Sequence, residues 1–224
     1  MTAVTTAKRG LGRVFRMLFP LLLILWILLV LYPNPVRLAT SVQRLVNPGI
    51  DTAAVESAAA SLPDDPAAIE DSVLESIPYG YDWQVYGMPW YFPTVNEVMQ
   101  AGEGDCKGRA LVLASVLEAK DIPYSLNTSP IHVWVDYEGK EETEVENQNA
   151  SFYQLDPETG QRSFGLPSID PMEVLNTFWE GFWSPMPAVR KALLLVGLII
   201  LIAARVIWSR EAPANAVLPV REGL

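Results

Sequence analysis

The sequence predicts a soluble domain, built from helices followed by antiparallel strands, between two transmembrane helices. Residues 17–32 and residues 192–204 are apolar blocks without a charged side chain, and such blocks suit the interior of a bilayer. Between them, an almost continuous apolar stretch at 111–120 is typical of a buried helix, and the alternating residues 131–137 are typical of a strand.

Charge and composition exclude several classes of protein. The net charge is −10 over 224 residues, and residues 33–189 carry 24 Asp and Glu against 7 Lys and Arg. This acidic balance argues against a nucleic-acid partner. One cysteine and one histidine cannot form a disulfide, a cysteine-based zinc site or a histidine-rich metal centre. We therefore expect no metal and no cofactor.

The first apolar block predicts a transmembrane helix over residues 14–33, after a cytoplasmic N-terminus at 1–13. A signal peptide is the alternative, but the block is as long as a span requires and no small-residue cleavage motif follows it. The second block predicts a helix over 190–209 if Arg205 extends its guanidinium to the interface. Its lack of a polar face counts against a buried core helix. A cytoplasmic tail follows at 210–224.

Basic residues near the spans indicate the orientation. Six lie on the terminal sides and four on the domain sides, so the positive-inside rule favours cytoplasmic termini. We expect an integral protein of the cell membrane with two spans, with the lipid bilayer as a partner and the soluble domain outside the cytoplasm. The ten residues are Lys8, Arg9, Arg13, Arg16, Arg205 and Arg210 on the terminal sides and Arg37, Arg44, Arg190 and Lys191 on the domain sides.

Two segments connect the spans to the soluble domain, which is expected over residues 63–170. Residues 34–62 predict a juxtamembrane helix or tether that Pro63 ends. Residues 171–189 predict an amphipathic segment at the membrane interface, because aromatic side chains recur in it at helical spacing. These are Phe178, Trp179, Phe182 and Trp183.

Local signals predict two helices in the first half of the domain. Asp65 can cap a helix that begins at Pro66, and Thr94 with Glu97 fits a capping box at the start of a short helix. The apolar face of the first helix consists of Ile69, Val73, Leu74 and Ile77. The aromatic loop between the two helices, residues 79–92, predicts either a lid on the core or a substrate groove.

The single cysteine begins the buried helix. Asp105 is a good N-cap, which places Cys106 in the first turn. There the thiol faces unpaired backbone N–H groups and the positive end of the helix dipole, and Lys107 and Arg109 add positive charge. This setting favours the thiolate.

The single histidine lies on a predicted strand. Residues 131–137 alternate so that His132 points to the face opposite the apolar set. Gly139 and Lys140 form a turn, after which residues 141–147 are expected to return as a second strand. A further hairpin is expected over residues 151–164, around a turn-rich segment.

A cysteine at a buried helix N-terminus, followed by a histidine on a strand, is the order of a thiol nucleophile and its base. The alternative is a small core cysteine and an ordinary strand histidine. Four segments also resemble the core of the transglutaminase-like superfamily, whose fold is related to papain-like cysteine proteases. They are PTVNEV at 93–98, GEGDCKGRA at 102–110, IPY at 122–124 and HVWVD at 132–136.

The resemblance covers roughly residues 60–170 and implies an α+β domain. It implies Cys106 as nucleophile and His132 as base in acyl transfer or hydrolysis at a peptide or carboxamide bond, as in an acyltransferase, protease or amidase. A peptide or protein would be the substrate. A catalytically silent module that binds peptides or assists assembly is the alternative.

The third member of the triad has three candidates. Glu146 is favoured, because it lies near the end of the expected second strand, where a one-residue change of the turn brings either Glu146 or Asn147 onto the histidine face. Asp156 precedes a proline, as the family's acid often does, but is better explained as a turn residue. For the oxyanion, the backbone N–H of Cys106 is one donor, and the side chains of Gln100 and Trp90 are candidates for a second.

Overall fold

A computed structural model describes residues 2–141, 143, 146, 151–156, 159–165 and 171–210, with side chains described from residue 14 to residue 208. The chain forms two compact units. One contains the segments up to Pro33 and from Pro187 onward, and the other runs from Asn34 to Met186.

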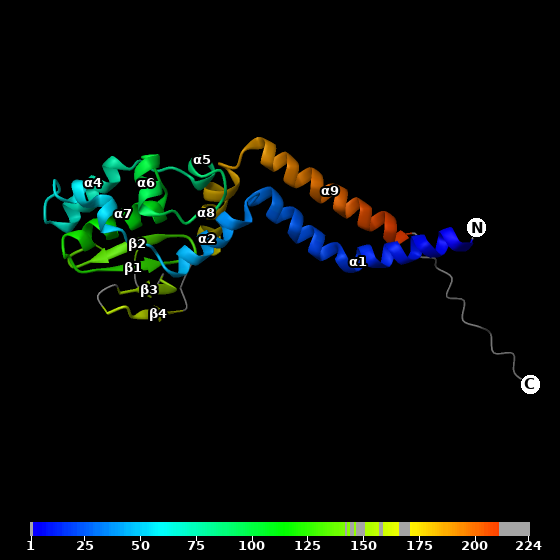
Figure 1. Ribbon diagram of the computed structural model, residues 1–224, viewed down its shortest axis with the longest axis horizontal. Helices are drawn as coiled ribbons and strands as arrows, with labels where there is room; N and C mark the ends of the chain where they lie inside the picture. The colour runs from blue at the N-terminus through cyan, green and yellow to red at the C-terminus, as the bar shows by residue number, and fades with distance from the viewer. Residues whose placement is uncertain are drawn as a thin grey trace, which may run out of the picture. The chain divides into compact units, whose positions relative to one another are not determined.

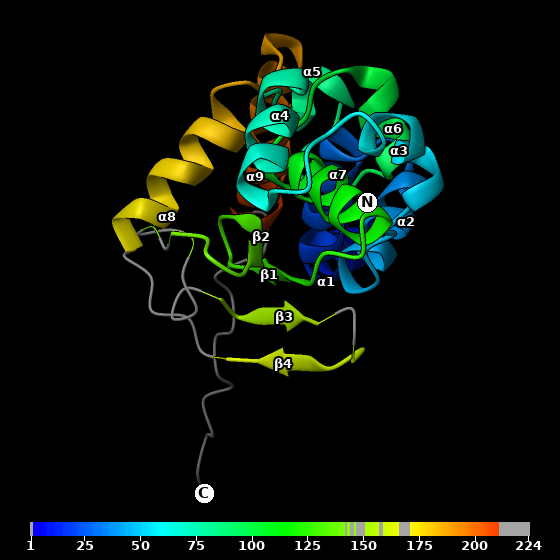
Figure 2. The same ribbon diagram turned by 90° about the vertical axis from the view of Figure 1, so that its left-hand side faces the viewer.

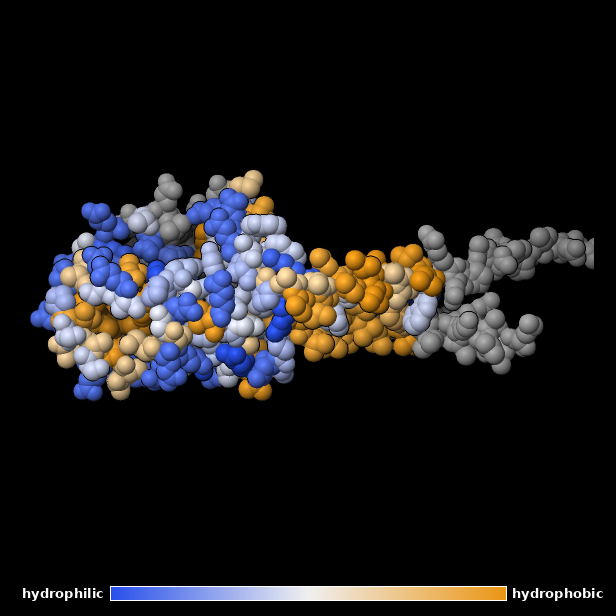
Figure 3. All heavy atoms as spheres, turned by 90° about the horizontal axis from the view of Figure 1, so that it is seen from above, coloured by the Kyte–Doolittle hydropathy of each residue, from blue (hydrophilic) through white to orange (hydrophobic). Residues whose placement is uncertain are grey.

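The first unit is a pair of long antiparallel helices, α1 (Thr2–Leu31) and α9 (Ala188–Arg210). Phe15 of α1 packs edge-on against Trp208 of α9, and at the other end Arg190 donates a hydrogen bond to the carbonyl of Val30. Windows at Val14–Leu31 and Ala188–Trp208 are long and apolar enough to cross a membrane. Most of their side chains are exposed, and Figure 3 shows a nearly continuous hydrophobic surface over the two helices.

The second unit has an α+β fold. In chain order, the elements that the structure describes before the sheet are α2 (Pro35–Val46), α3 (Thr52–Ala59), α4 (Pro66–Ser76), α5 (Asp82–Val85), α6 (Val95–Ala101) and α7 (Cys106–Ala119). After the sheet come α8 (Pro171–Phe178) and the π-helix η1 (Trp179–Trp183). The expected caps are present: Asp65 accepts from the Ala68 N–H at the start of α4, and Thr94 and Glu97 form a capping box at the start of α6.

Within the described residues, the sheet has four antiparallel strands in the order β2-β1-β3-β4. They are β1 (Tyr124–Thr128), β2 (Val133–Tyr137), β3 (Tyr153–Leu155) and β4 (Arg162–Phe164). In β1, Leu126 lies opposite Val135 of β2 and Leu155 of β3. The hairpin expected over residues 151–164 is therefore formed by β3 and β4.

The strand expected over residues 141–147 is not seen at its described residues: 141, 143 and 146 are not in a strand. Residues 142, 144, 145 and 147 lie outside the described part of the chain. β2 pairs with β1. Ser129 closes the hairpin of β1 and β2, because its N–H donates to the His132 carbonyl and its hydroxyl accepts from the His132 N–H. Glu146 lies at a bend. The Thr143 N–H donates to its carbonyl, and the Glu146 N–H donates to the Thr143 hydroxyl, so these groups do not bond in a ladder with β2.

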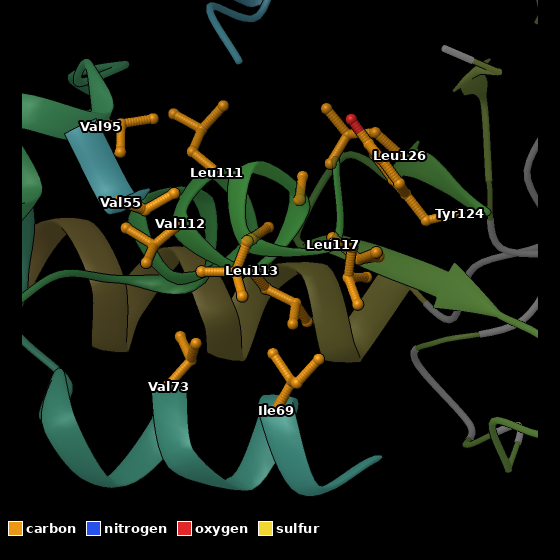
Figure 4. Close-up of a cluster of buried hydrophobic side chains, with 14 of the residues drawn as sticks. Val55, Ile69, Val73, Val95, Leu111, Val112, Leu113, Leu117, Tyr124 and Leu126 are labelled. Atoms are coloured by element: carbon orange, nitrogen blue, oxygen red, sulfur yellow. The ribbon is translucent and has the colours of Figure 1, made fainter. Parts of the chain in front are cut away.

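Helix α7 is the centre of the core. It packs against α3, α4 and α6 and against β1 and β2. Figure 4 shows Ile69 and Val73 of α4 pointing toward α7, whose Leu111 and Leu117 are fully buried. Leu74, expected on the same face of α4, is 42% exposed, because only the stripe of Ile69, Val73 and Ile77 meets the core. The buried cluster fixes α7, and with it the position of Cys106.

Residues 34–62 form α2 and α3, which both belong to the second unit. Val55 of α3 is fully buried in the core. From α2, the Ser41 hydroxyl accepts from the Phe92 N–H and donates to the Trp90 carbonyl. Arg44 also forms an ion pair with Glu97 of α6. These bonds tie the aromatic loop to the helical side of the domain.

Candidate active site

Cys106 is the first residue of α7 and is half-buried. The carboxylate of Asp105 caps the helix by accepting from the N–H groups of Lys107 and Gly108. The preceding residue, Gly104, is held in place by the segment after α4: its N–H donates to the Pro78 carbonyl, and its carbonyl accepts from the Gly80 N–H. The cap and this bridge fix the backbone on both sides of the thiol.

His132 lies between the turn at Ser129 and the start of β2. Its Nε2 is 2.7 Å from Oε1 of Glu146, and Cys106 is close enough to act on the pKa of the imidazole. Because Glu146 contacts Nε2, Nδ1 is the ring nitrogen available to a reacting group. The imidazole stacks on the buried ring of Trp134, with centroids 6.0 Å apart and planes 10° from parallel. The histidine is thus held at Nε2 by Glu146 and on one face by Trp134.

The charge state of His132 follows from these contacts. Burial acts to lower its pKa, but the hydrogen bonds with Cys106 and Glu146, together with their negative charges, outweigh burial and raise the pKa of His132 to about 9. A pKa of about 9 favours the charged form of the imidazole at neutral pH.

Glu146 uses both of its carboxylate oxygens. Oε1 accepts from His132, and Oε2 lies 3.1 Å from Nζ of Lys140. Burial acts to raise the pKa of Glu146, but the hydrogen bond from His132 and the charge and hydrogen bond of Lys140 outweigh it and hold the pKa below its usual value. Glu146 is thus an anion that accepts from the imidazolium.

Of the other two candidates for the third position, the structure describes Asp156. Asp156 follows β3, and its carboxylate accepts from the N–H and the hydroxyl of Thr159 in the turn that leads to β4. Asn147 lies outside the described residues. Of the candidates that the structure describes, Glu146 contacts His132.

The two candidates for a second oxyanion donor are both exposed at the surface. Gln100 is an exposed residue near the end of α6. Trp90 is 57% exposed, and its indole stacks on Phe182 with ring centroids 5.1 Å apart. Its backbone has a positive φ of 45°, which is uncommon for a non-glycine residue. The backbone N–H of Cys106 remains the donor with the clearest geometric basis, since it lies in the first turn of α7.

The cations next to Cys106 are already partnered. Lys107 forms ion pairs with Asp105 and with the buried Asp82 of α5, whose Oδ2 is 3.0 Å from Nζ. Arg109 donates from Nε to the Ile77 carbonyl, and its guanidinium lies over the Tyr79 ring. Much of the Lys107 charge is thus offset by two carboxylates rather than directed at the sulfur.

Asp82 is a site neighbour that the sequence did not reveal. Burial raises its pKa to about 7, while Lys107 acts to lower it and Asp105 to raise it. Its Oδ2 also accepts from the Tyr91 N–H, which links the aromatic loop to the start of α7. An aspartate among buried aromatic residues was the available signal, because such a residue requires a partner.

Within the residues that the structure describes, no group of three or more His, Cys, Asp and Glu side chains could hold a metal ion. Comparisons with protein-family models, with curated proteins and with solved structures found no match. The geometry of Cys106, His132 and Glu146 is therefore the observation from which a function can be inferred.

Proposed function

We propose that this protein is a membrane-anchored, transglutaminase-like thiol enzyme that performs acyl transfer or hydrolysis at peptide or carboxamide bonds. The observation that supports this most strongly is the 2.7 Å contact between His132 and Glu146, together with Cys106 at the start of α7, which acts on the pKa of the same imidazole. It combines a nucleophile, a base and a group that orients the base, as covalent acyl-transfer catalysis requires.

In the first half of the reaction, the Cys106 sulfur attacks the carbonyl carbon of the substrate and forms a C–S bond. The carbonyl electron pair moves onto oxygen, where the backbone N–H of Cys106 can donate to it. The C–N bond then breaks, and His132 gives its proton to the departing amine. The products of this half are a thioester on Cys106 and a free amine or ammonia.

In the second half, water or an amine attacks the thioester carbon. His132, now neutral, accepts the proton of the attacking group, and the C–S bond breaks to release the sulfur as thiolate. Glu146 holds the imidazole in one orientation throughout and stabilises its charged form. Water as acceptor gives hydrolysis, and an amine gives transfer.

We also propose that α1 and α9 are the membrane anchors. Both windows meet the length and hydropathy of a span, and many of their large apolar residues are exposed. Exposed apolar surface of this extent is unfavourable in water and is satisfied by lipid. The flanking charges favour a soluble domain outside the cytoplasm.

The test uses the fact that the chain has one cysteine, so that every thiol label reports on Cys106. We expect the full-length protein in detergent to react with iodoacetamide near pH 6.5 much faster than glutathione does. Incubation with a glutamine-containing peptide should add the mass of an acyl group, which hydroxylamine then removes as a hydroxamate. His132→Gln should lose both properties. Labelling no faster than that of glutathione across pH 6–9 would contradict the proposal.

Exposed aromatic residues favour the second candidate, a catalytically silent peptide-binding module. Trp90 and Trp179 are 57% and 58% exposed, and large apolar residues of this kind are typical of interaction surfaces. For such a module, peptide binding should survive Cys106→Ala unchanged and no acyl adduct should form. For the enzyme, the same substitution should abolish adduct formation.

A further inference from the structure

Lys140 lies in the turn after β2 and is almost buried, with 10% of its side chain exposed. Its ammonium group donates to three oxygens: Oε1 of Glu70 at 2.8 Å, the carbonyl of Val135 at 2.9 Å and Oε2 of Glu146 at 3.1 Å. A lysine ammonium has three N–H donors, so these contacts use all of them.

The three acceptors belong to different parts of the domain. Glu70 is on α4 and is itself fixed by a hydrogen bond of 2.6 Å from the Tyr137 hydroxyl. Val135 is a fully buried residue in the middle of β2. Glu146, by contrast, lies on a bend in which its backbone bonds to Thr143. Lys140 therefore connects a carboxylate on a bend to a helix and a strand that the core holds in place.

We infer that Lys140 is a positioning residue for the proposed reaction and holds Glu146 in the orientation in which it accepts from His132. This inference rests on the proposed function. A carboxylate with one oxygen on the imidazole can still rotate about its side-chain bonds, and a second bond to a buried cation removes that freedom. Two fixed oxygens define the plane of the carboxylate.

A positioning role of Lys140 and a direct effect of its charge predict opposite changes in the pKa of His132. Helix α4 contributes Glu70, and Asp71 of the same helix and its N-cap Asp65 also act on the Tyr137 hydroxyl next to it. Removal of a cation near His132 would by Coulomb's law favour the imidazolium and raise the pKa of His132. Loss of Glu146 from its place would lower that pKa. The sign of the change therefore distinguishes the two roles.

The chain has one histidine, so a single imidazole signal reports on the site. We would label the full-length protein in detergent with ¹³C-histidine and titrate His132 by NMR. Lys140→Met should lower the pKa of His132 by about one pH unit or more, as expected for the loss of an adjacent anion. Lys140→Arg keeps the positive charge and the N–H donors, so the pKa of His132 in this variant should be closer to that of the unmodified protein. Lys120→Met is the matched control, because Lys120 pairs with Asp64 instead.

A double-mutant comparison tests whether Lys140 acts through Glu146. Glu146→Gln alone should lower the pKa of His132, and Lys140→Met added to it should produce no further fall. If Lys140→Met does not fold, as judged by circular dichroism, Lys140→Gln carries the same expectation. An unchanged or raised pKa of His132 in a folded Lys140 variant would overturn the inference. Slow labelling of Cys106 in the unmodified protein would instead contradict the proposed function.

Discussion

Oε1 of Glu146 lies 2.7 Å from Nε2 of His132, and the two residues are fourteen positions apart in the chain. The carboxylate reaches the imidazole from a bend, not from a neighbouring strand, and its second oxygen is held by Lys140. Two side-chain contacts thus define the orientation of the histidine and of the acid. Substitutions at either residue should therefore affect Cys106 chemistry more than folding.

We predict that Glu146→Gln reduces turnover by a factor on the order of 10³ to 10⁴, as expected when an imidazole loses the group that fixes its tautomer. The measurement is the rate of hydroxamate formation from a glutamine-containing peptide, with thermal unfolding followed in parallel. The unfolding temperature should change little, because Glu146 is only half-buried. Full activity in Glu146→Gln, or a large loss in Asn147→Ala, would show that Glu146 is not the orienting group.

Asp156→Ala should behave differently from Glu146→Gln. Its carboxylate accepts from Thr159 within the turn between β3 and β4, so we expect a loss of about 1 kcal/mol in the free energy of unfolding. Turnover per folded molecule should be unchanged. Denaturant unfolding and the hydroxamate assay on the same sample check both statements, and a loss of turnover without a loss of stability would assign Asp156 to the site.

Stability should depend on pH through His132. Contacts with Cys106 and Glu146 outweigh burial and raise the pKa of His132 from 6.5 to about 9. A group whose pKa is raised on folding binds its proton more tightly in the folded state, so its contribution is complete below pH 6.5 and is lost as the pH rises through about 9. The unmodified protein should therefore have a larger free energy of unfolding than His132→Gln below pH 6.5, and this difference should disappear as the pH rises to about 9. A difference that grows with pH would contradict a raised pKa of His132 in the folded protein.

Interactions between residues close in sequence were predictable, and those between distant residues were not. Asp65, Thr94 and Asp105 all cap the helices expected of them, because a cap acts within about three residues of itself. Glu146 was expected near the end of a strand, whereas it lies at a bend and its backbone bonds to Thr143. The partner of Lys107, Asp82, is 25 residues away in the aromatic loop, and no local pattern joins them.

The single cysteine also reports on membrane topology. If the flanking basic residues set the orientation, the soluble unit lies outside the cytoplasm, and a membrane-impermeant maleimide should label Cys106 in intact cells that express the protein. Thr6→Cys in a Cys106→Ala background should be labelled only after permeabilisation. Labelling of Cys106 that requires permeabilisation would reverse the orientation.

Lys107 should matter more for folding than for the reactivity of Cys106. Its ammonium group pairs with Asp82 and Asp105, and 14% of its side chain is exposed. Lys107→Met would leave two carboxylates beside each other in a buried place, so we expect a loss of about 3 kcal/mol in the free energy of unfolding. Arg109→Met, which removes a hydrogen bond to Ile77 and a contact with Tyr79, should cost about 1 kcal/mol.

The pH dependence of the stability lost in Lys107→Met identifies the cause of that loss. Burial raises the pKa of Asp82 to about 7 while Lys107 acts to lower it, so without Lys107 the carboxyl of Asp82 should retain its proton to higher pH. A buried acid that must ionise destabilises the folded state increasingly as the pH rises, and the loss should be larger at pH 8 than at pH 6. Asp82→Asn added to Lys107→Met should recover part of the stability at pH 8. A defect that is independent of pH and insensitive to Asp82→Asn would mean that Lys107 contributes through packing of its aliphatic stem instead.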